Sequence, residues 1–427
     1  MNAELKAYDI VVVGGGSAGI AAISSIQKRR SGLRIAVIEP KEDHYYQPGW
    51  TMVGGGVFML EETKRPEQDI IPDGVTWIKD EVSMFDPDHD KVTLKSGEII
   101  SYGHMVVAPG LKLNWDAVEG LKDAIGKNGV TSNYLYETAD YTWKLVQNFK
   151  GGKAIFTQPT MPIKCAGAPQ KAMYLSCSHW LSNGTLGGTQ VEFCNAGAVL
   201  FGVAAYVAPL MKYVDKYNIK LRHNENLIAV DGPNKVASFN CTDADGNVKR
   251  VEKKYDLLHV CPPQCALDFI KNSPLADETG YLAVDPVTLQ HKKYANIFGA
   301  GDTISTLNAK TVAAARKHAG IVAENLLSAK DGTELRATYD GYGSCPLTVK
   351  HGKIILAEFG YGGKIIPTFP KWVNNTLKAT RFAWFLKSRL LPWIYWNFML
   401  KGHEYYAKPH HICSNPGTCT KHQMDRP

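Results

Sequence analysis

The segment Tyr8-Asp9-Ile10-Val11-Val12-Val13-Gly14-Gly15-Gly16-Ser17-Ala18-Gly19 decides the fold of this chain. Its first half is a mostly apolar run, typical of a buried parallel strand. Its second half is a glycine loop leading into a helix predicted from Ile20 to about Lys28. A second apolar strand, predicted from Arg34 to Ile38, ends at Glu39. The strand, the G-x-G-x-x-G loop, the helix and the terminal acidic residue together predict a dinucleotide-binding βαβ unit.

Each glycine of this loop has its own role. Gly14 permits the tight turn, Gly16 lets the backbone approach a pyrophosphate, and Gly19 lets helix and strand pack closely. The free N–H groups of the helix N-terminus attract the phosphates. Glu39 can accept hydrogen bonds from ribose hydroxyls.

Two later segments have the pattern that frames FAD in flavoproteins with two dinucleotide domains. A strand predicted from Tyr102 to Ala108 ends in Pro109-Gly110, and a strand from Asn296 to Phe298 runs into Gly299-Ala300-Gly301-Asp302. By resemblance, the aspartate binds a ribityl or phosphate oxygen of the cofactor. A helix predicted from Lys310 to about Leu327 would direct its N-terminus at the flavin, where negative charge develops on reduction.

The middle of the chain resembles a second nucleotide-binding domain with an altered loop. Strands are predicted at 153–157 and 190–194, and the turn after the latter reads Asn195-Ala196-Gly197-Ala198-Val199-Leu200-Phe201-Gly202. Four side chains between its glycines crowd the space that a pyrophosphate needs. The next strand, 220–222, supplies no clean acidic terminus. We therefore expect a domain that keeps its architecture without binding NAD(P)H.

Length and composition narrow the class of protein. The chain has 427 residues, a formal net charge of +7 and nine cysteines. Two or three domains are expected for this length. The cysteine spacing indicates neither a secreted disulfide framework nor a zinc site, and Cys413 and Cys419 suggest no role. Because Met1–Tyr8 is short and polar, no signal peptide is expected.

Residues 374–402 differ in character from the rest of the chain. Large apolar and basic residues are interleaved, as in Trp384-Phe385-Leu386-Lys387-Ser388-Arg389-Leu390-Leu391. Pro392 is predicted to divide this stretch into two short helices. Such amphipathic helices favour a membrane interface, although a cap on the core or a dimer contact would use the same residues. No window offers about 20 uncharged apolar residues, so we expect peripheral contact rather than a spanning helix.

Two cysteines lie in loop segments about 180 positions apart. Cys165 lies in Lys164-Cys165-Ala166-Gly167-Ala168-Pro169-Gln170-Lys171, and Cys345 lies in Gly343-Ser344-Cys345-Pro346-Leu347. These segments resemble sulfide:quinone oxidoreductase, more closely the mitochondrial type and its bacterial relatives. The resemblance runs from about residue 8 to about residue 405 and includes Gly14–Gly19, Ile38-Glu39-Pro40, Tyr46-Gln47-Pro48 and Gly299–Asp302.

The resemblance implies a redox-active cysteine pair beside a bound FAD. Carried over, Cys345 would hold a persulfide after attack by hydrosulfide, and Cys165 would react with the flavin. Electrons would pass to a membrane quinone (ubiquinone or menaquinone), and the sulfur to a small acceptor such as glutathione or sulfite. Lys164 and Lys171 are expected to lower the pKa of Cys165, unless they point to solvent. Lys387 matches a basic position near the quinone end of the family fold.

The motifs and the resemblance together give a set of predicted site residues. Those expected to bind FAD are Gly14, Gly16, Ser17, Ala18, Gly19, Glu39, Gln47, Val82, Gly110, Gly301, Asp302, Lys310 and Thr311. Those expected on the substrate and quinone side are Lys171, Lys387, Phe385 and Trp393, beside the catalytic pair Cys165 and Cys345.

Other cysteines and histidines carry weaker expectations. Cys177, Cys194, Cys241 and Cys261 stand in apolar settings typical of inert buried thiols. Some relatives of the photosynthetic-bacterial type carry a third cysteine near positions 110–130, which this chain lacks, so no covalent flavin link is expected there. His44 would line the adenine side of the cofactor or simply pack, and His259 is expected in the core.

The expected architecture is α/β, with two Rossmann-like dinucleotide-binding domains and a C-terminal amphipathic region for membrane attachment. We place a discontinuous FAD-binding domain at 1–150 and 280–330, the second, degenerate domain at 151–279, and the C-terminal region at 331–427. The expected location is the bacterial cytoplasmic membrane or the mitochondrial inner membrane. A homo-oligomer fits these features, whereas neither a metal nor a nucleic-acid partner is expected.

Three other functions remain open from the sequence. A type II NADH:quinone oxidoreductase shares fold, FAD and membrane attachment but needs a working second glycine loop. A soluble disulfide reductase normally places its two cysteines close together in sequence. A membrane-associated scaffold that had kept the fold would not need Glu39, Asp302 and both loop cysteines.

Overall fold

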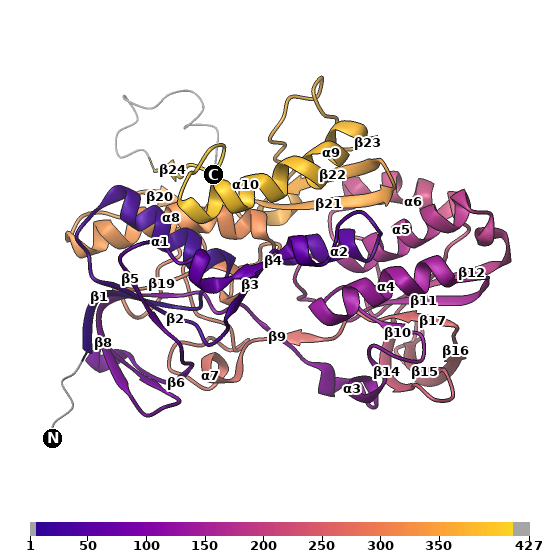
Figure 1. Cartoon of the computed structure of the whole chain (residues 1–427), viewed down its shortest axis with the longest axis horizontal. Coiled ribbons are helices and arrows are strands. Elements are labelled where there is room, and N and C mark those ends of the chain that lie inside the picture. The colour runs from indigo at the N-terminus through magenta and orange to yellow at the C-terminus, as the bar shows by residue number, and fades with distance from the viewer. Residues whose placement is uncertain (1–5, 413–427) are drawn as a thin grey trace.

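The computed structural model describes residues 6–412. Two largely parallel sheets lie side by side, and C-terminal elements run along both (Figure 1). The first sheet has the order β5-β2-β1-β8-β7-β6, with β19 also paired to β8. Its strands are β1 (Lys6–Val13), β2 (Ile35–Ile38), β5 (Val75–Ile78), β6 (Val82–Asp86), β7 (Lys91–Leu94), β8 (Ile99–Val107) and β19 (Ile297–Gly299).

The predicted βαβ unit is present, with α1 at Ser17–Arg29 between β1 and β2. The apolar residues of β2 and of the second half of β1 are buried, and α1 packs against α8 (Val312–Lys330). Strand pairing aligns the last residues of four strands: Val13 with Ile38 and Val107, and Val107 with Gly299. The four carboxyl ends therefore meet at one edge of the sheet, the edge where such folds bind their ligands.

The second sheet has the order β10-β17-β11-β12-β13. Its strands and helices are β10 (Val130–Thr131), β11 (Gly152–Gln158), β12 (Thr189–Asn195), β13 (Lys220–His223), β17 (Leu257–His259), α4 (Tyr136–Asn148), α5 (Ala168–Ser182) and α6 (Val207–Lys216). β10 and α4 precede the expected domain boundary at residue 150, yet β10 belongs to this sheet. We therefore propose that the second domain begins before β10.

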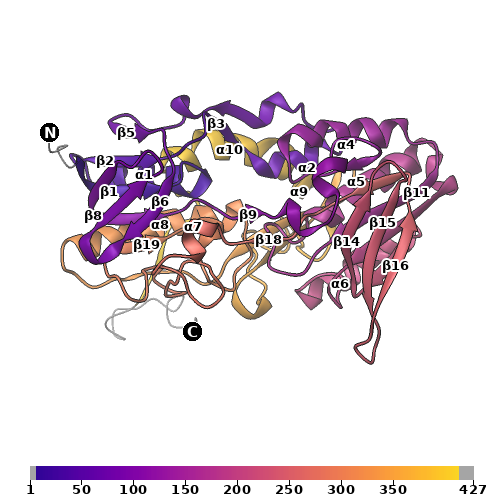
Figure 2. The same cartoon turned by 90° about the horizontal axis from the view of Figure 1, so that it is seen from below.

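Antiparallel strands complete the fold. Figure 2 shows one sheet, β14 to β16, at the end of the molecule away from β1. The hairpin β21–β22 packs on α5 and carries Cys345. The strands are β3 (Asp43–Tyr45), β4 (Lys64–Pro66), β9 (Lys112–Leu113), β14 (Glu225–Asp231), β15 (Val236–Thr242), β16 (Val248–Lys254), β18 (Gln264–Cys265), β20 (Ala337–Thr338), β21 (Gly343–Lys350), β22 (Lys353–Phe359), β23 (Ala379–Thr380) and β24 (His410–His411). The short helices are α2 (Trp50–Val53), α3 (Leu121–Ala124) and α7 (Asp268–Lys271).

The C-terminal helices correct one detail of the prediction. α9 (Arg381–Phe385), a π-helical turn (Leu386–Leu390) and α10 (Leu391–Asn397) follow one another without a break at Pro392. Pro392 is the second residue of α10, directly after the π-helical turn, so the run stays helical through the proline. Within residues 6–412, no helix combines the length and the apolar character needed to cross a bilayer.

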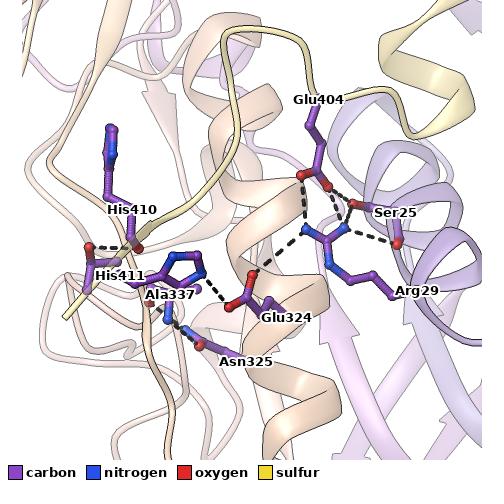
Figure 3. A network of polar contacts seen from close by, with 9 residues as sticks. Ser25, Arg29, Glu324, Asn325, Ala337, Glu404, His410 and His411 are labelled. Carbon is purple, nitrogen blue, oxygen red and sulfur yellow. Dashed lines mark hydrogen bonds and ion pairs between the residues drawn. The ribbon is translucent and has the colours of Figure 1, made fainter. Parts of the chain in front are cut away.

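The C-terminal segment is tied to the first domain by an ion-pair network (Figure 3). The Arg29 guanidinium on α1 binds both carboxylate oxygens of Glu404, at 2.5 and 2.9 Å. Ser25 also donates to Glu404, and His411 contacts Glu324 on α8 at 2.6 Å. The segment after α10 is thus attached to the helix that follows the glycine loop. Cys413 and Cys419 lie outside the described residues.

Candidate functional site

Three loops meet at the carboxyl edge of the first sheet. A Cβ atom added at Gly14 (φ = 101°) would lie 2.7 Å from backbone atoms of Ala108 and Pro109. One added at Gly301 (φ = 77°) would lie 2.9 Å from the Cβ atom of Ala18. Glycine suits both positions because of the positive φ and the close contact. The three predicted cofactor segments are therefore in contact with one another.

The surroundings of the glycine loop fit a bound FAD. Among the described residues, no atom lies within 4 Å of a Cβ added at Gly16 or Gly110, so a pyrophosphate can approach the backbone there. Glu39 directly follows the last residue of β2, and its carboxylate accepts a hydrogen bond from the Gly15 N–H at 2.8 Å. Nearby, the Oε1 atom of Glu67 is buried and has no hydrogen-bond partner in the described part of the chain. Such an atom is expected where a polar ligand completes the site.

Lys310 links the cofactor loops to the cysteine site. Its ammonium donates to the carbonyl oxygens of Asp302 and Ile304 at 2.8 and 2.9 Å. Its own carbonyl oxygen accepts from the Cys165 N–H at 2.7 Å. Burial lowers the pKa of Lys310 to about 8 and raises the pKa of Asp302. The backbone of Cys165 is therefore bonded to the segment that holds Asp302.

Cys165 and Cys345 lie together, with their Sγ atoms 3.6 Å apart. Cys165 is in the turn before α5 and has a left-handed backbone (φ = 49°), a costly conformation for any residue except glycine. Cys345 is buried in β21. Since a disulfide needs about 2.05 Å between its sulfurs, a relative shift of about 1.5 Å would join them. The pair is placed to form and break a disulfide.

Lys171 is the charged partner of this pair. It lies in the first turn of α5, is 2% exposed, and donates to the Cys165 Sγ at 3.0 Å. A buried ammonium is costly without an anionic partner, and a thiolate at Cys165 supplies one. The N-terminus of α5, which starts three residues after Cys165, adds partial positive charge.

These contacts shift the pKa values of the two thiols in opposite directions. The hydrogen bond from Cys345 acts most strongly and, with the Lys171 ammonium, outweighs burial to hold the pKa of Cys165 well below its usual range. The same contact, together with burial, raises the pKa of Cys345 well above its usual range. Although burial alone would lower the pKa of Lys171, the two sulfurs raise it. The reduced pair therefore holds one proton, on Cys345, and presents Cys165 as the thiolate.

Two further lysines hold the segment Gln47-Pro48. The Lys164 ammonium donates to Gln47 Oε1 at 2.5 Å, and the Lys387 ammonium donates to the Pro48 carbonyl oxygen at 2.7 Å. Burial lowers the pKa of Lys164 to about 8. Burial and the Lys171 charge lower the pKa of Lys387 to about 7. Lys387 is 3% exposed, so its amine lies inside the protein rather than in solvent. With a pKa of about 7, this buried amine gains or loses its charge near neutral pH.

The remaining predicted residues take other places. Phe385 and Trp393 are 54% and 52% exposed, on the outer side of the C-terminal helices. Val82 begins β6 and is buried in the first core. The Thr311 hydroxyl caps α8 by accepting from the Ala314 N–H at 3.2 Å. These positions do not touch the cysteine pair through any described contact.

Sequence reasoning missed a chain of buried polar groups next to the glycine loop. The Ser17 hydroxyl lies 2.6 Å from the Tyr395 hydroxyl, which lies 2.7 Å from His44 Nε2. The other ring nitrogen, His44 Nδ1, lies 3.0 Å from Glu67 Oε2. The only signal in the sequence was the nearness of His44 to the Tyr46-Gln47-Pro48 motif.

A second histidine was also missed. His318 on α8 is fully buried, and its Nδ1 atom accepts from the Gly301 N–H at 3.1 Å. Burial lowers the pKa of His318 to about 3, so the ring is neutral and can accept this bond. His259, by contrast, lies in the core as expected, with burial lowering its pKa to about 3.

The other cysteines have the character of structural thiols. Cys177, Cys194 and Cys261 are buried, and burial raises the pKa of each, to about 12 for Cys261. Cys241 is half-buried in β15. Across residues 6–412, no group of three or more His, Cys, Asp or Glu side chains is arranged to bind a metal ion.

Gly167 permits the close approach of the two sulfurs, which gives a first prediction. A Cβ atom at this position would lie 2.5 Å from Cys345 Sγ and 2.4 Å from Leu347 Cδ2. Gly167→Ala is therefore expected to displace Cys345 and to slow about tenfold any turnover that uses the cysteine pair. The matched control is Gly187→Ala, where no described atom lies within 4 Å of the added Cβ. Wild-type turnover in Gly167→Ala would contradict the geometry of the pair.

Comparisons with known proteins identify the family of this chain. The family described as pyridine nucleotide-disulphide oxidoreductase matches residues 8–146. The "Sulfide:quinone oxidoreductase, mitochondrial" of Dictyostelium discoideum is 42% identical over 396 residues, which cover 92% of this chain and 86% of that protein. The Mus musculus protein of the same name is 37% identical over 396 residues, covering 93% and 87%.

A solved structure has the same fold. The X-ray structure of the sulfide:quinone oxidoreductase from Aquifex aeolicus matches with a TM-score of 0.76 and 19% identity, covering 96% of this chain and 98% of that one. The match extends over both sheets and the C-terminal region. With identity of 37–42% to the two curated relatives over most of the length of both partners, the chain belongs to the sulfide:quinone oxidoreductase family of FAD-binding flavoproteins.

Proposed function

We propose that this protein oxidises hydrogen sulfide to sulfane sulfur with the pair Cys165 and Cys345 and passes the electrons through FAD to a membrane quinone. One observation carries the proposal: the two sulfurs lie 3.6 Å apart, with the Lys171 ammonium 3.0 Å from one of them. Lys171 stabilises the thiolate that leaves when a disulfide at this position is opened.

The cycle starts from the oxidised pair. Hydrosulfide attacks Sγ of Cys345, the bond between the two cysteines breaks, and the new S–S bond makes Cys345 a persulfide. Cys165 leaves as a thiolate beside Lys171. Attack in this direction is favoured because Cys165, whose pKa is the lower of the two, is the better leaving group.

A small nucleophile such as glutathione or sulfite then takes the outer sulfur and leaves Cys345 reduced. FAD bound at the glycine loop would supply the two-electron acceptor needed to close the disulfide again, which releases the proton held by the reduced pair, and would connect the pair to a quinone. We assign the electron-donating role to Cys165, since its N–H is bonded to the Lys310 carbonyl at the cofactor edge.

The predicted cofactor residues have places suited to FAD. The N–H groups at Gly16, Ser17 and Ala18 would bind the phosphates, and Glu39 would accept from the ribose. Asp302, held between Gly301 and Lys310, would face the flavin end. Lys387, with its pKa lowered to about 7 by burial and by Lys171, can hold or release a proton on the quinone side.

A pyridine nucleotide is not proposed as electron donor because the second loop is filled. The Leu200 carbonyl accepts from Gln170 Nε2 at 2.5 Å, and the Val199 carbonyl accepts from Asn195 Nδ2 at 2.8 Å. Leu200 and Phe201 are buried in the second core. The next helix, α6, begins at Val207, after a 3-10 turn at Ala204–Tyr206.

A membrane surface is the proposed location. Trp372, Phe385 and Trp393 are 87%, 54% and 52% exposed along the C-terminal region. The exposed basic residues around them are Lys371, Lys378, Arg381 and Arg389. Exposed aromatic and basic side chains together suit the headgroup region of a bilayer.

The test is anaerobic stopped-flow mixing of the flavin-loaded protein with sulfide or with NADH, followed by flavin absorbance. Sulfide is expected to bleach the flavin within the turnover time, and decylubiquinone to restore it. NADH is expected to leave the absorbance unchanged. Rapid bleaching by NADH together with no response to sulfide would overturn the proposal.

A further inference from the structure

One buried hydrogen-bonded chain has no part in the sulfur chemistry. It joins side chains from four separate segments: Ser17 at the start of α1, Tyr395 in α10, His44 in β3 and Glu67 in a 3-10 turn after β4. The successive contacts are 2.6, 2.7 and 3.0 Å. His44, Glu67 and Tyr395 are each 2% exposed, so their polar groups depend on one another rather than on water.

Both ends of this chain reach the glycine loop. Ser17 belongs to the loop itself. At the other end, Glu67 Oε1 would lie 2.7 Å from a Cβ atom added at Gly15, on the side of the loop that also meets Glu39. In the described residues this oxygen has no hydrogen-bond partner. The chain therefore borders the place where the first sheet and α1 present their N–H groups to a phosphate.

An anion bound at the loop would set the direction of the chain. A phosphate would accept from the Ser17 hydroxyl, whose oxygen would then accept from the Tyr395 hydroxyl. Tyr395 would in turn accept from His44 Nε2–H, and His44 Nδ1 and Glu67 would share one proton. Burial raises the pKa of the Glu67 carboxyl, although the hydrogen bond from His44 opposes this shift. A raised pKa favours a proton at this end of the chain. Hydrogen bonds aligned in one direction strengthen one another and the last donor.

We propose that Tyr395 is a positioning residue for FAD, which acts through the Ser17 hydroxyl and is itself held by His44 and Glu67. Tyr395 belongs to α10, which lies beside α1 (Figure 1) and turns the exposed Trp393 outward. The outer side of α10 is proposed to face the membrane. Its inner side, through Tyr395, would order the glycine loop that binds the phosphates. The affinity for FAD would then depend on the position of α10 against the start of α1.

The primary test is Tyr395→Phe, which keeps the ring and removes only the hydroxyl. The full-length protein is freed of flavin, and FAD binding is titrated by quenching of flavin fluorescence. The dissociation constant is expected to rise about fivefold, the order expected for one lost hydrogen bond. The matched control is Tyr217→Phe, which removes an equally buried hydroxyl that donates to the Val349 carbonyl at 2.9 Å in the second core. This control is expected to lower the melting temperature and to leave FAD affinity unchanged.

A double mutant separates positioning from packing. If Tyr395 acts through Ser17, Tyr395→Phe adds no further loss of FAD affinity in a Ser17→Ala background. Fully additive losses, or an affinity within twofold of wild type in the single variant, would overturn the proposal.

A second pair of variants keeps the test decisive if Tyr395→Phe fails to fold. His44→Gln can place its amide nitrogen near the Nε2 position and keep the bond to Tyr395, whereas His44→Asn can reach only toward Glu67. FAD affinity is expected to fall in His44→Asn and to remain closer to wild type in His44→Gln. Equal affinities of the two would contradict the proposal. None of these titrations uses sulfide or quinone, so their outcome is independent of the proposed reaction.

Discussion

Cys165→Ser and Cys345→Ser are each expected to lower sulfide-dependent quinone reduction by at least about 1000-fold, the order seen when a nucleophile that acts as part of a unit is removed. Serine cannot form the disulfide that hydrosulfide opens, and neither cysteine alone can both hold a persulfide and release a partner thiolate. The measurement is steady-state reduction of decylubiquinone by sulfide in detergent. The flavin absorbance spectrum confirms that each variant is loaded.

The two variants should also differ from each other in thiol reactivity. In Cys345→Ser the remaining Cys165 keeps Lys171 at 3.0 Å and should react with iodoacetamide at neutral pH, because a neighbouring cation favours its thiolate. In Cys165→Ser the remaining Cys345 is buried and should react slowly. Cys241→Ser, in the remote sheet β14 to β16, is the control and should keep full turnover. Turnover within tenfold of wild type in either pair variant would contradict the assigned chemistry.

The cofactor edge was predictable because its constraints are local. The turn needs a glycine at position 14, where φ is positive, and the helix packs directly on this turn at Gly19. Both requirements select glycines at a fixed spacing, which can be recognised in the sequence. The predicted strands and helices of both nucleotide-like domains lie within three residues of those observed. The carboxyl ends of four strands then meet at one edge, because these strands pair in parallel and in register.

The cysteine site was predictable only through resemblance. Cys165 and Cys345 are 180 residues apart, and their contact is made by the packing of β21 on α5. Lysine is among the residues least often buried, so the buried places of Lys171 and Lys387 run against the usual expectation for that residue type. Lys171 is buried where α5 packs on β21, and Lys387 where the C-terminal helices meet Pro48, and no local pattern encodes these contacts.

The chain from Ser17 to Glu67 was not predictable because each residue comes from a different segment. Tyr395 lies 378 positions from Ser17, and its neighbours in sequence suggested only an amphipathic helix. Pro392 likewise suggested a break that the structure does not show, because the π-helical turn Leu386–Leu390 continues directly into α10. The sequence therefore indicated the exposed amphipathic side of α10, but not the buried hydrogen bonds that Tyr395 makes on its inner side.

Lys171→Met is expected to lower turnover about 100-fold at neutral pH and to let it recover as the pH rises. The Lys171 ammonium, with the Cys345 hydrogen bond, holds the pKa of Cys165 well below its usual range. Removing the ammonium raises that pKa, so less Cys165 is thiolate at neutral pH. The acid limb of the pH profile of kcat should therefore move to higher pH, by about two units for an opposite charge at this distance.

Two companion variants separate this effect from others. Lys212→Met removes an exposed lysine on α6 and should leave the profile unchanged. Lys387 also titrates near this range, because burial and Lys171 lower its pKa to about 7. Lys387→Met should therefore remove a limb near pH 7 and leave the thiolate limb of Cys165 close to its wild-type position. If the profile of Lys171→Met lies on that of the wild type, the low pKa of Cys165 has another origin. The Cys345 thiol, whose hydrogen bond acts most strongly on Cys165, would then be the main group that stabilises the Cys165 thiolate, and Cys345→Ser would have to raise the pKa of Cys165 by itself.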